Sequence, residues 1–197
     1  FTDDQPTWEY PITATEIFSS SGYDSVWVSS VDPNYFVTST SEDLYYSTDA
    51  GMTWTEAEVD IALTGAVFQI VNDAAGTLYA TVGPNTSAGA QTGGVITSSD
   101  HGATWTSLDF PDAGATHAIA VASDGDIFVG AHSTVHGVYV YRDNTWTKLS
   151  APDEEYRAII TDPVDASTSY ALAASTGVYK STDDGVTWEQ IVSGLGD

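Results

Sequence analysis

Two histidines in one short segment are the most obvious candidates for metal chemistry. His132 and His136 lie four residues apart in Ala-His-Ser-Thr-Val-His-Gly. This spacing suits two zinc ligands on one face of a helix, where side chains at i and i+4 are neighbours. The segment has the composition of a loop, however, and no third ligand is apparent nearby. We therefore predict no metal site, and keep both histidines as candidate ligand-binding residues.

The longest predicted loop runs from residue 83 to residue 93 and is rich in small and amide side chains. Asn85 and Gln91 can donate and accept hydrogen bonds, which suits contact with a sugar or a peptide. Solvated decoration of the surface is the alternative. Residues 85–87 also form a glycosylation sequon, which matters only in a glycosylating secretory route. Asn85 and Gln91 are the candidate ligand-binding residues of this loop.

Acidic side chains dominate the charge of the chain. The 197 residues include 28 Asp and Glu but only 4 Lys and Arg, giving a formal net charge of -24, and no cysteine. A field of this sign repels nucleic acid and anionic lipid, so neither is expected as a partner. With 42% hydrophobic residues the chain is expected to fold, and no apolar run is long enough for a membrane span. This balance suits a secreted or cell-surface protein in a salty medium.

Sequence signatures of catalysis and cofactor binding are missing. The chain has no phosphate-binding glycine loop, nucleotide fingerprint or Ser-His-Asp signature. Without cysteine there is also no thiol nucleophile or thiolate metal site. We therefore predict no cofactor and assign no catalytic residue.

Five tryptophans share one sequence context and reveal an internal repeat. Three copies are nearly complete: S-T-D-A-G-M-T-W from Ser47, S-S-D-H-G-A-T-W from Ser98 and S-T-D-D-G-V-T-W from Ser181. A first copy, F-T-D-D-Q-P-T-W, begins at Phe1, and a shortened one, Y-R-D-N-T-W, begins at Tyr141. The tryptophans are 41 to 51 residues apart, a period typical of propeller blades.

The residue types of the repeat suit a tight turn between two strands. The aspartate can accept hydrogen bonds from backbone N–H groups, and the glycine two residues later permits a positive φ. The tryptophan then opens the next strand and covers the hairpin. We assign this structural role to Asp3, Trp8, Asp49, Gly51, Trp54, Asp100, Gly102, Trp105, Asp143, Trp146, Asp183, Gly185 and Trp188.

Two further strands are predicted upstream of each later turn, so each full repeat contains four. The first is an apolar or alternating run, as at 67–71, and the second follows a polar turn, as at 78–82. No window has a sustained helical period. The sequence therefore predicts an all-β fold of four-stranded antiparallel propeller blades. The predicted units within the single segment 1–197 are 1–20 (partial), 21–62, 63–112, 113–152 and 153–197.

The S-x-D-x-G-x-T-W motif resembles the Asp-box, or bacterial neuraminidase repeat. On these residues the chain is similar to the β-propellers of sialidases, xyloglucanase-type glycoside hydrolases, sortilin-like receptors and photosystem II assembly factors. The resemblance covers nearly the whole chain and implies a propeller fold. It does not select one function, because these families share blades and differ in chemistry.

The catalytic groups of two of these families can be sought in the chain. A sialidase would need three arginines to clamp the substrate carboxylate, but only Arg142 and Arg157 are present, and Arg142 falls inside a repeat turn. Sialidase activity by this chain alone is therefore not expected. A xyloglucanase-type hydrolase needs two carboxylates across a cleft. Asp24, Asp112 and residues 153–155 fall near predicted inter-blade loops, where a solvated surface is the simpler interpretation.

The leading hypothesis is a non-catalytic extracellular or cell-surface propeller segment that serves as a binding or assembly module. Its ligand would be a glycan or a protein on the face where the loops between second and third strands gather. One alternative is part of a xyloglucanase-like glycoside hydrolase completed by further blades, and another is a self-assembling surface or fibre subunit. Four full blades and one leading orphan strand favour a segment of a larger propeller, or an array completed by another chain, over a self-closed ring.

Overall fold

The computed structural model describes residues 23–29, 31–40, 43–61, 66–83, 93–111, 115–132 and 136–191. Within these residues the chain forms 17 β-strands in four sheets and contains no helix. Accordingly, no helix in this part of the chain is long and apolar enough to cross a membrane. The all-β prediction is confirmed.

The four sheets follow one another along the chain, each as an antiparallel meander. The first sheet consists of β1 (Tyr23–Val28), β2 (Phe36–Thr40), β3 (Leu44–Ser47) and β4 (Thr55–Glu56). The second consists of β6 (Val67–Asn72), β7 (Leu78–Val82), β8 (Gly94–Ser98) and β9 (Thr104–Ser107), joined by the short β5 (Glu58–Val59). The third consists of β10 (Ala115–Val121), β11 (Ile127–His132), β12 (Gly137–Arg142) and β13 (Thr145–Lys148). The fourth consists of β14 (Tyr156–Thr161), β15 (Ser169–Ala173), β16 (Gly177–Ser181) and β17 (Glu189–Ile191).

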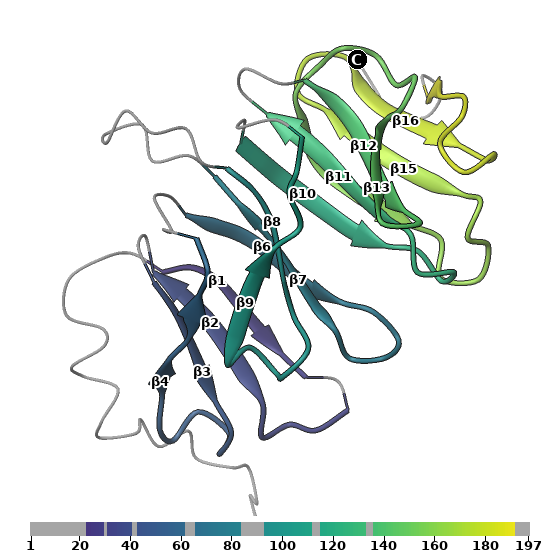
Figure 1. The fold of residues 1–197 in the computed structure, drawn as a ribbon. Coiled ribbons are helices and arrows are strands. Elements are labelled where there is room, and N and C mark those ends of the chain that lie inside the picture. Colours follow the sequence, from purple (N-terminus) through teal and green to yellow (C-terminus); the bar gives the residue numbers. More distant parts are fainter. Residues whose placement is uncertain are drawn as a thin grey trace, which may run out of the picture.

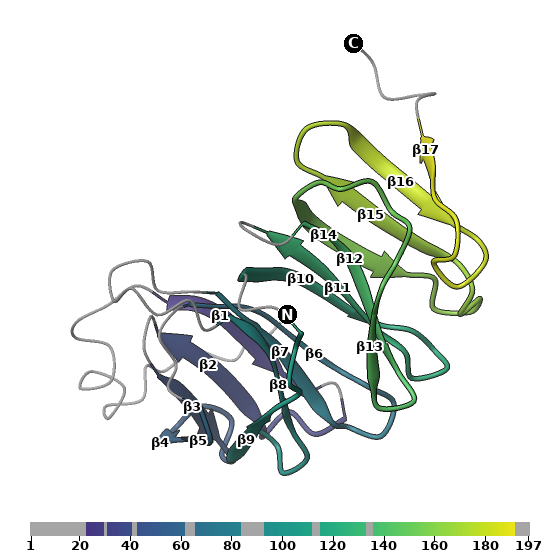
Figure 2. The same ribbon diagram turned by 45° about the horizontal axis from the view of Figure 1, so that its top comes forward.

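The sheets stand side by side in chain order, as blades of a partial β-propeller (Figure 1). Their first strands are the innermost, and β1, β6, β10 and β14 contact one another in that order. The view in Figure 2 shows the same row, with the first and fourth sheets at its two ends. The four-stranded blades predicted from the repeat are therefore present, and their inner strands form one continuous wall.

The second sheet departs from the four-strand pattern because the link from the first sheet adds a strand to it. β5 pairs in parallel with β9, so that Glu58 N donates to Ala103 O at 2.9 Å and Asp60 N donates to Trp105 O at 3.0 Å. The Asp60 carboxylate also accepts a hydrogen bond from Ser107 N at 3.0 Å. These contacts cover the outer edge of β9, which would otherwise be open to pairing with another strand.

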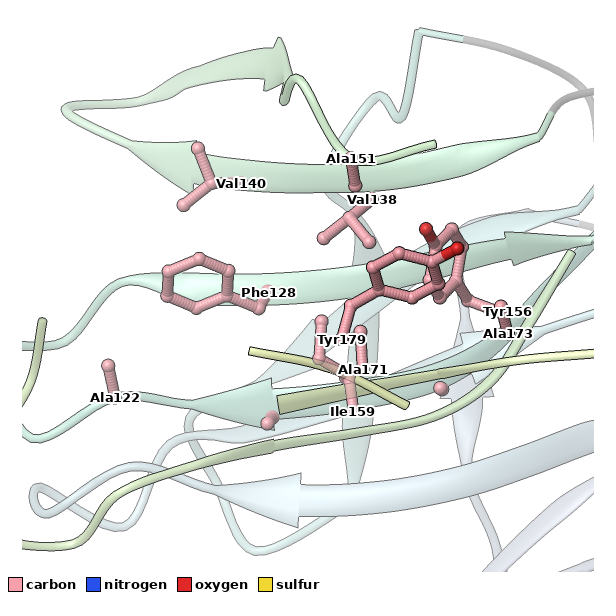
Figure 3. Close-up of a cluster of buried hydrophobic side chains, with 12 residues drawn as sticks. Ala122, Phe128, Val138, Val140, Ala151, Tyr156, Ile159, Ala171, Ala173 and Tyr179 are labelled. Atoms are coloured by element: carbon pink, nitrogen blue, oxygen red, sulfur yellow. The ribbon is translucent and has the colours of Figure 1, made fainter. Parts of the chain in front are cut away.

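Three apolar cores lie between the sheets, one at each junction. Central members are Val37, Leu44, Leu78 and Ile96 at the first junction, Val95, Ile119, Ile127 and Val129 at the second, and Phe128, Val138, Tyr156 and Ile159 at the third. In the third core, side chains of the third sheet face Ile159, Ala171 and Tyr179 of the fourth (Figure 3). Among the described residues, the two inner sheets thus pack on both faces, while the outermost sheets each pack on one.

The three complete repeat turns share one hydrogen-bond network. In the first, the Asp49 carboxylate accepts from Thr53 N at 2.8 Å and from Thr53 Oγ1 at 2.6 Å. Ser47 Oγ donates to the same carboxylate at 2.8 Å and accepts from Gly51 N at 2.9 Å. The same bonds recur in the turns at Asp100 and Asp183. Each turn is therefore closed by side-chain acceptors that satisfy backbone donors.

These hydrogen bonds favour the ionised form of each aspartate. For Asp49 and Asp183 the bond from the threonine side chain is the main reason that the pKa lies below its ordinary value of 3.8. For Asp100, burial raises the pKa, but the backbone and side-chain bonds from Thr104 outweigh it and lower the pKa. All three carboxylates act as fixed acceptors in their turns.

Two of the turn glycines are required by the close approach of the turn to the preceding sheet. Gly102 has a φ of 93°, and a Cβ there would lie 2.5 Å from Val37 Cγ2. Gly185 has a φ of 81°, and a Cβ there would lie 2.5 Å from Leu149 Cδ1. Any other residue would be strained in its backbone and would also collide with the neighbouring sheet.

The shortened fourth copy of the repeat has a different turn from the one expected. Asp143 and Asn144 have φ values of 50° and 58° and sit between the paired residues Arg142 and Thr145. Two successive positive φ values give a two-residue hairpin turn of type I′. The hydrogen bond made at Asp143 goes from Thr145 Oγ1 to the backbone carbonyl at 3.4 Å, so backbone geometry closes this turn.

Candidate functional site

Each of the four innermost strands carries a β-bulge near its start. Pairing with the neighbouring strand shifts register at Asp24, Phe68, His117 and Arg157. A bulge bends its strand and re-aims a side chain, and bulges are common at barrel rims and beside binding sites. The antiparallel order puts all four bulges at the end of the sheets opposite the repeat turns. These positions therefore mark one edge of the inner wall.

Along this edge, side chains from three neighbouring sheets contact one another in a row. The rings of Phe68 and His117 have centroids 3.9 Å apart at an angle of 44°. His117 stacks on His132 with centroids 4.2 Å apart and an interplanar angle of 6°. His132 Nε2 lies 3.1 Å from Glu155 Oε2. We call Phe68, His117, His132, Glu155 and Arg157 the bulge row.

The electrostatics of the bulge row favour an uncharged ring at its centre. Burial lowers the pKa of His117 below its ordinary value of 6.5, and the nearby His132 and Arg157 lower it further, against the opposing effect of Glu155. His117 is therefore neutral at neutral pH, with one nitrogen able to donate a hydrogen bond and one able to accept. Arg157 is exposed, which leaves a cationic group at the end of the row.

Two glycines make room for the bulge row. At Gly83 a Cβ would overlap the ring of Phe68, so only glycine lets that ring lie over the end of β7. At Gly130 a Cβ would lie 2.8 Å from the Cβ of Tyr156 and 3.2 Å from that of Ala118. The missing side chain at Gly130 therefore lets β14 approach the third sheet closely enough to bring Glu155 to His132.

A hollow of about 430 Å³ lies along the inner wall, over the part of the inner strands that runs from the bulges toward the repeat turns. It is lined by Trp27 and by residues 69–72, 119–121 and 159–161. Hydrogen bonds between sheets fix this wall. Trp27 Nε1 donates to Asn72 Oδ1 at 3.2 Å, and Ile119 N donates to Gln69 Oε1 at 3.1 Å. The hollow is shallow, and its lining mixes apolar side chains with polar groups that are already hydrogen-bonded between sheets.

The sequence candidates fall in three places. His132 belongs to the bulge row, whereas His136 lies just before β12 and contributes, after the main effect of Lys148, to the lowered pKa of Asp153. Among the described residues no three His, Cys, Asp or Glu side chains are grouped to hold a metal ion. Asp3, Trp8, Asn85, Gln91 and Asp112 lie outside the described residues.

The acidic residues ahead of β14 are consecutive in sequence and have separate surroundings. Asp153 pairs with Lys148 at 2.9 Å, and Glu155 contacts His132. Glu154 has one buried carboxylate oxygen without a hydrogen-bond partner among the described residues. In this part of the chain the three acids follow one another along a single segment, and do not face each other across a cleft as hydrolysis of a glycoside requires.

Phe68, His117 and Arg157 were missed as site candidates from the sequence, although a signal was present. Each lies two residues before an isoleucine in the first strand of its repeat, in Phe-Gln-Ile, His-Ala-Ile and Arg-Ala-Ile. Large or polar side chains at one fixed position of the repeat would have pointed to a shared edge. Their closeness depends on the bulges, which composition alone does not predict.

No protein-family model matches the sequence, and no curated protein matches it significantly. Solved structures with a similar fold include an ancestral GH74 enzyme, with 19% identity, a TM-score of 0.65, and coverage of 87% of this chain and 24% of that one. YCF48 bound to D1 peptide has 15% identity, a TM-score of 0.60, and coverage of 88% and 54%. The extracellular domain of BT4673, a putative hybrid two-component system from B. thetaiotaomicron, has 12% identity, a TM-score of 0.62, and coverage of 81% and 21%.

These similarities establish the β-propeller fold, and at such low identity they show the fold alone. The chain spans about a quarter of the GH74 enzyme and about half of YCF48. The fold hosts unrelated chemistries, so function has to be argued from the site.

Proposed function

We propose that this chain is a β-propeller segment that acts outside the cell as a non-catalytic binding module, with a glycan held on the bulge row. The observation that carries the proposal is the row of ring contacts from Phe68 through His117 to His132, which crosses from the second sheet to the third. An aromatic ring offers an apolar face to the C–H groups of a sugar. Imidazole, guanidinium and carboxylate groups beside it can bond to sugar hydroxyls.

The repeat turns support a division of roles between the two ends of the sheets. We assign the turns at Asp49, Asp100 and Asp183 to the Asp-box type, on the basis of their shared Ser-Asp-Thr hydrogen bonds. Their carboxylates are already occupied by bonds within the turn. The ligand is therefore expected at the opposite end, where the bulge row lies.

Location outside the cell is supported by the charge of the chain. A net charge of -24 with only 16% charged residues leaves much of the surface to neutral polar groups, which suits a medium where salt shortens electrostatic repulsion. Detection of the protein in the culture medium or the cell envelope of its source would support this assignment. Detection only in the soluble cell interior would contradict it.

The binding proposal is tested with a panel of soluble oligosaccharides and with peptides as a counter-screen, by isothermal titration calorimetry. Phe68→Ala is expected to weaken binding of a hit about tenfold, because one lost ring contact is worth about 1 to 1.5 kcal/mol. The matched control is Val164→Ala, since Val164 is 90% exposed and lies in a turn at the other end of the fourth sheet.

Three results would contradict the proposal in different ways. Binding of peptides but not of glycans would contradict the proposed class of ligand. Glycan binding that is unchanged in Phe68→Ala would show that the glycan binds outside the bulge row. Release of reducing sugar from a bound glycan would show that the module is catalytic.

A further inference from the structure

The two outermost sheets each present apolar side chains on a face that has no other sheet against it among the described residues. On the first sheet, Val26 and Val28 of β1 are 69% and 45% exposed. On the fourth sheet, Ile160 of β14 and Leu172 of β15 are 61% and 41% exposed. These faces belong to opposite ends of the row of sheets (Figure 2). We call them the first face, with Val26 and Val28, and the last face, with Ile160 and Leu172.

Residues at equivalent positions in the other sheets show what the first face is built to contact. Val26 lies two residues after the bulge of its strand, as do Ile70, Ile119 and Ile159. The three isoleucines are 8%, 0% and 2% exposed, because each packs into the core shared with the preceding sheet. The first face therefore corresponds to the surface on which, in the other sheets, the preceding sheet packs.

The last face is the complementary kind of surface. Ile160 lies three residues after its bulge, in the position of Ala120, which is 8% exposed and packs against the following sheet. Leu172 pairs with Ala158 across the sheet, as Gly130 pairs with Ala118 in the third sheet, where Ala118 is 0% exposed. Figure 3 shows how such a junction is filled, with Phe128 and Val138 of one sheet facing Ile159 and Ala171 of the next.

We propose that a second copy of this chain docks head to tail, with the last face of one copy against the first face of the next. A second copy fits both faces, because the two halves of a sheet-to-sheet junction are both present on this chain. Different surfaces meet in such a contact, so it is heterologous, and it closes into a ring or continues as a filament according to the rotation between copies. Ile160 also borders the hollow of the inner wall, but no docking residue belongs to the bulge row, so this proposal does not rest on the glycan-binding one.

The charge of the chain sets the conditions for docking. Two copies carry -24 each, and their repulsion opposes association at low ionic strength. At about 1 M salt the screening length falls to about 3 Å, so the attraction between the apolar faces outweighs the repulsion that remains. Association is therefore expected to strengthen as salt rises.

The experiment is sedimentation velocity on the full chain at several protein concentrations, in 0.1 M and 1 M NaCl as chosen conditions. We expect dimers or larger species whose fraction grows with protein and salt concentration. Ile160→Asp and Val26→Asp should each reduce association at least tenfold, since each places a charge in one half of the junction. Val164→Asp is the matched control, because it adds the same charge at a residue that is 90% exposed and on neither face.

A mixture of the two single variants tests the head-to-tail geometry. The Ile160→Asp copy keeps its first face and the Val26→Asp copy keeps its last face, so together they retain one intact junction. The mixture should form a heterodimer and stop there. A wild-type chain that remains monomeric in every condition would overturn the proposal and assign these faces to a different partner. A mixture that stays monomeric, or association that one variant abolishes and the other leaves unchanged, would overturn the head-to-tail arrangement.

Discussion

The hydroxyl of Ser98 is buried and its hydrogen bonds help to close the repeat turn at Asp100. It donates to the Asp100 carboxylate at 2.8 Å and accepts from Gly102 N at 2.9 Å, and Ser98 itself is buried. Ser98→Ala would leave a buried backbone donor without its acceptor, so we expect a loss of about 1 to 3 kcal/mol in the free energy of unfolding. Ser99→Ala, at an exposed neighbour in the same turn, is the control. Urea titration measures both, and equal stability of the two variants would contradict the role of the hydroxyl.

His117 gives the bulge row a defined dependence on pH. Because burial, and after it the nearby His132 and Arg157, lower its pKa below 6.5, the unfolded chain binds a proton at this residue more readily than the folded one. The stability that this residue contributes is present above pH 6.5 and is lost as the pH falls from there through the folded pKa. His117→Phe should therefore reduce the loss of stability between pH 7 and pH 5, as measured by denaturant unfolding. A variant with the same pH profile as wild type would show that His117 does not titrate in this way.

At the scale of elements, the regular contacts of the repeat made most of the fold predictable. Strands alternate with turns whose Asp, Gly and Trp residues recur at one spacing, so local hydrogen bonds and φ requirements identify each turn. β5 was not predictable in the same way, because Glu58 and Val59 have no strand pattern and pair only with a strand that comes more than forty residues later. The turn at Asp143 also differs, since it lacks the glycine and forms a two-residue hairpin.

The candidate site was less predictable than the sheets. His132 was identified from sequence as a residue capable of chemistry, but other members of the bulge row, such as Phe68 and Glu155, lie far from it in the chain. They meet because bulges and the missing side chains at Gly83 and Gly130 set the spacing of three sheets. Such spacing is a property of packing between elements, and a single repeat unit does not encode it.

The packing of turns on neighbouring sheets leads to a prediction at this scale. Gly185 and Gly177 both have positive φ, 81° and 100°, but only at Gly185 would a Cβ meet the neighbouring sheet, at Leu149 and Phe128. Gly177→Ala should cost about 1 kcal/mol from backbone strain alone, and Gly185→Ala about 2 to 4 kcal/mol from strain plus overpacking. Thermal and urea unfolding of both variants measure the difference. Similar losses of stability in the two variants would mean that the turn at Gly185 can shift away from Leu149 and Phe128 without losing free energy.

At the scale of the whole molecule, the four cations neutralise little of the negative charge. Arg142 is paired with Asp126, Lys148 is paired with Asp153, and Lys180 lies 5.5 Å from the centre of the Tyr170 ring. Arg157, the remaining cation, stands in the bulge row. With 28 acids and only 4 cations in the sequence, the mutual repulsion of the acids acts against the folded state.

Salt should consequently stabilise the folded chain. The screening length falls from about 30 Å at 0.01 M to about 10 Å at 0.1 M and about 3 Å at 1 M, so repulsion among distant acids is largely removed within this range. We expect the melting temperature to rise by several degrees between 0.01 M and 0.5 M NaCl and then to level off. The measurement uses the Val26→Asp, Ile160→Asp double variant at low concentration, because association of the wild type would add its own stabilisation. A melting temperature that stays constant or falls with salt would mean that specific ion pairs, and not net repulsion, dominate the electrostatic free energy of this fold.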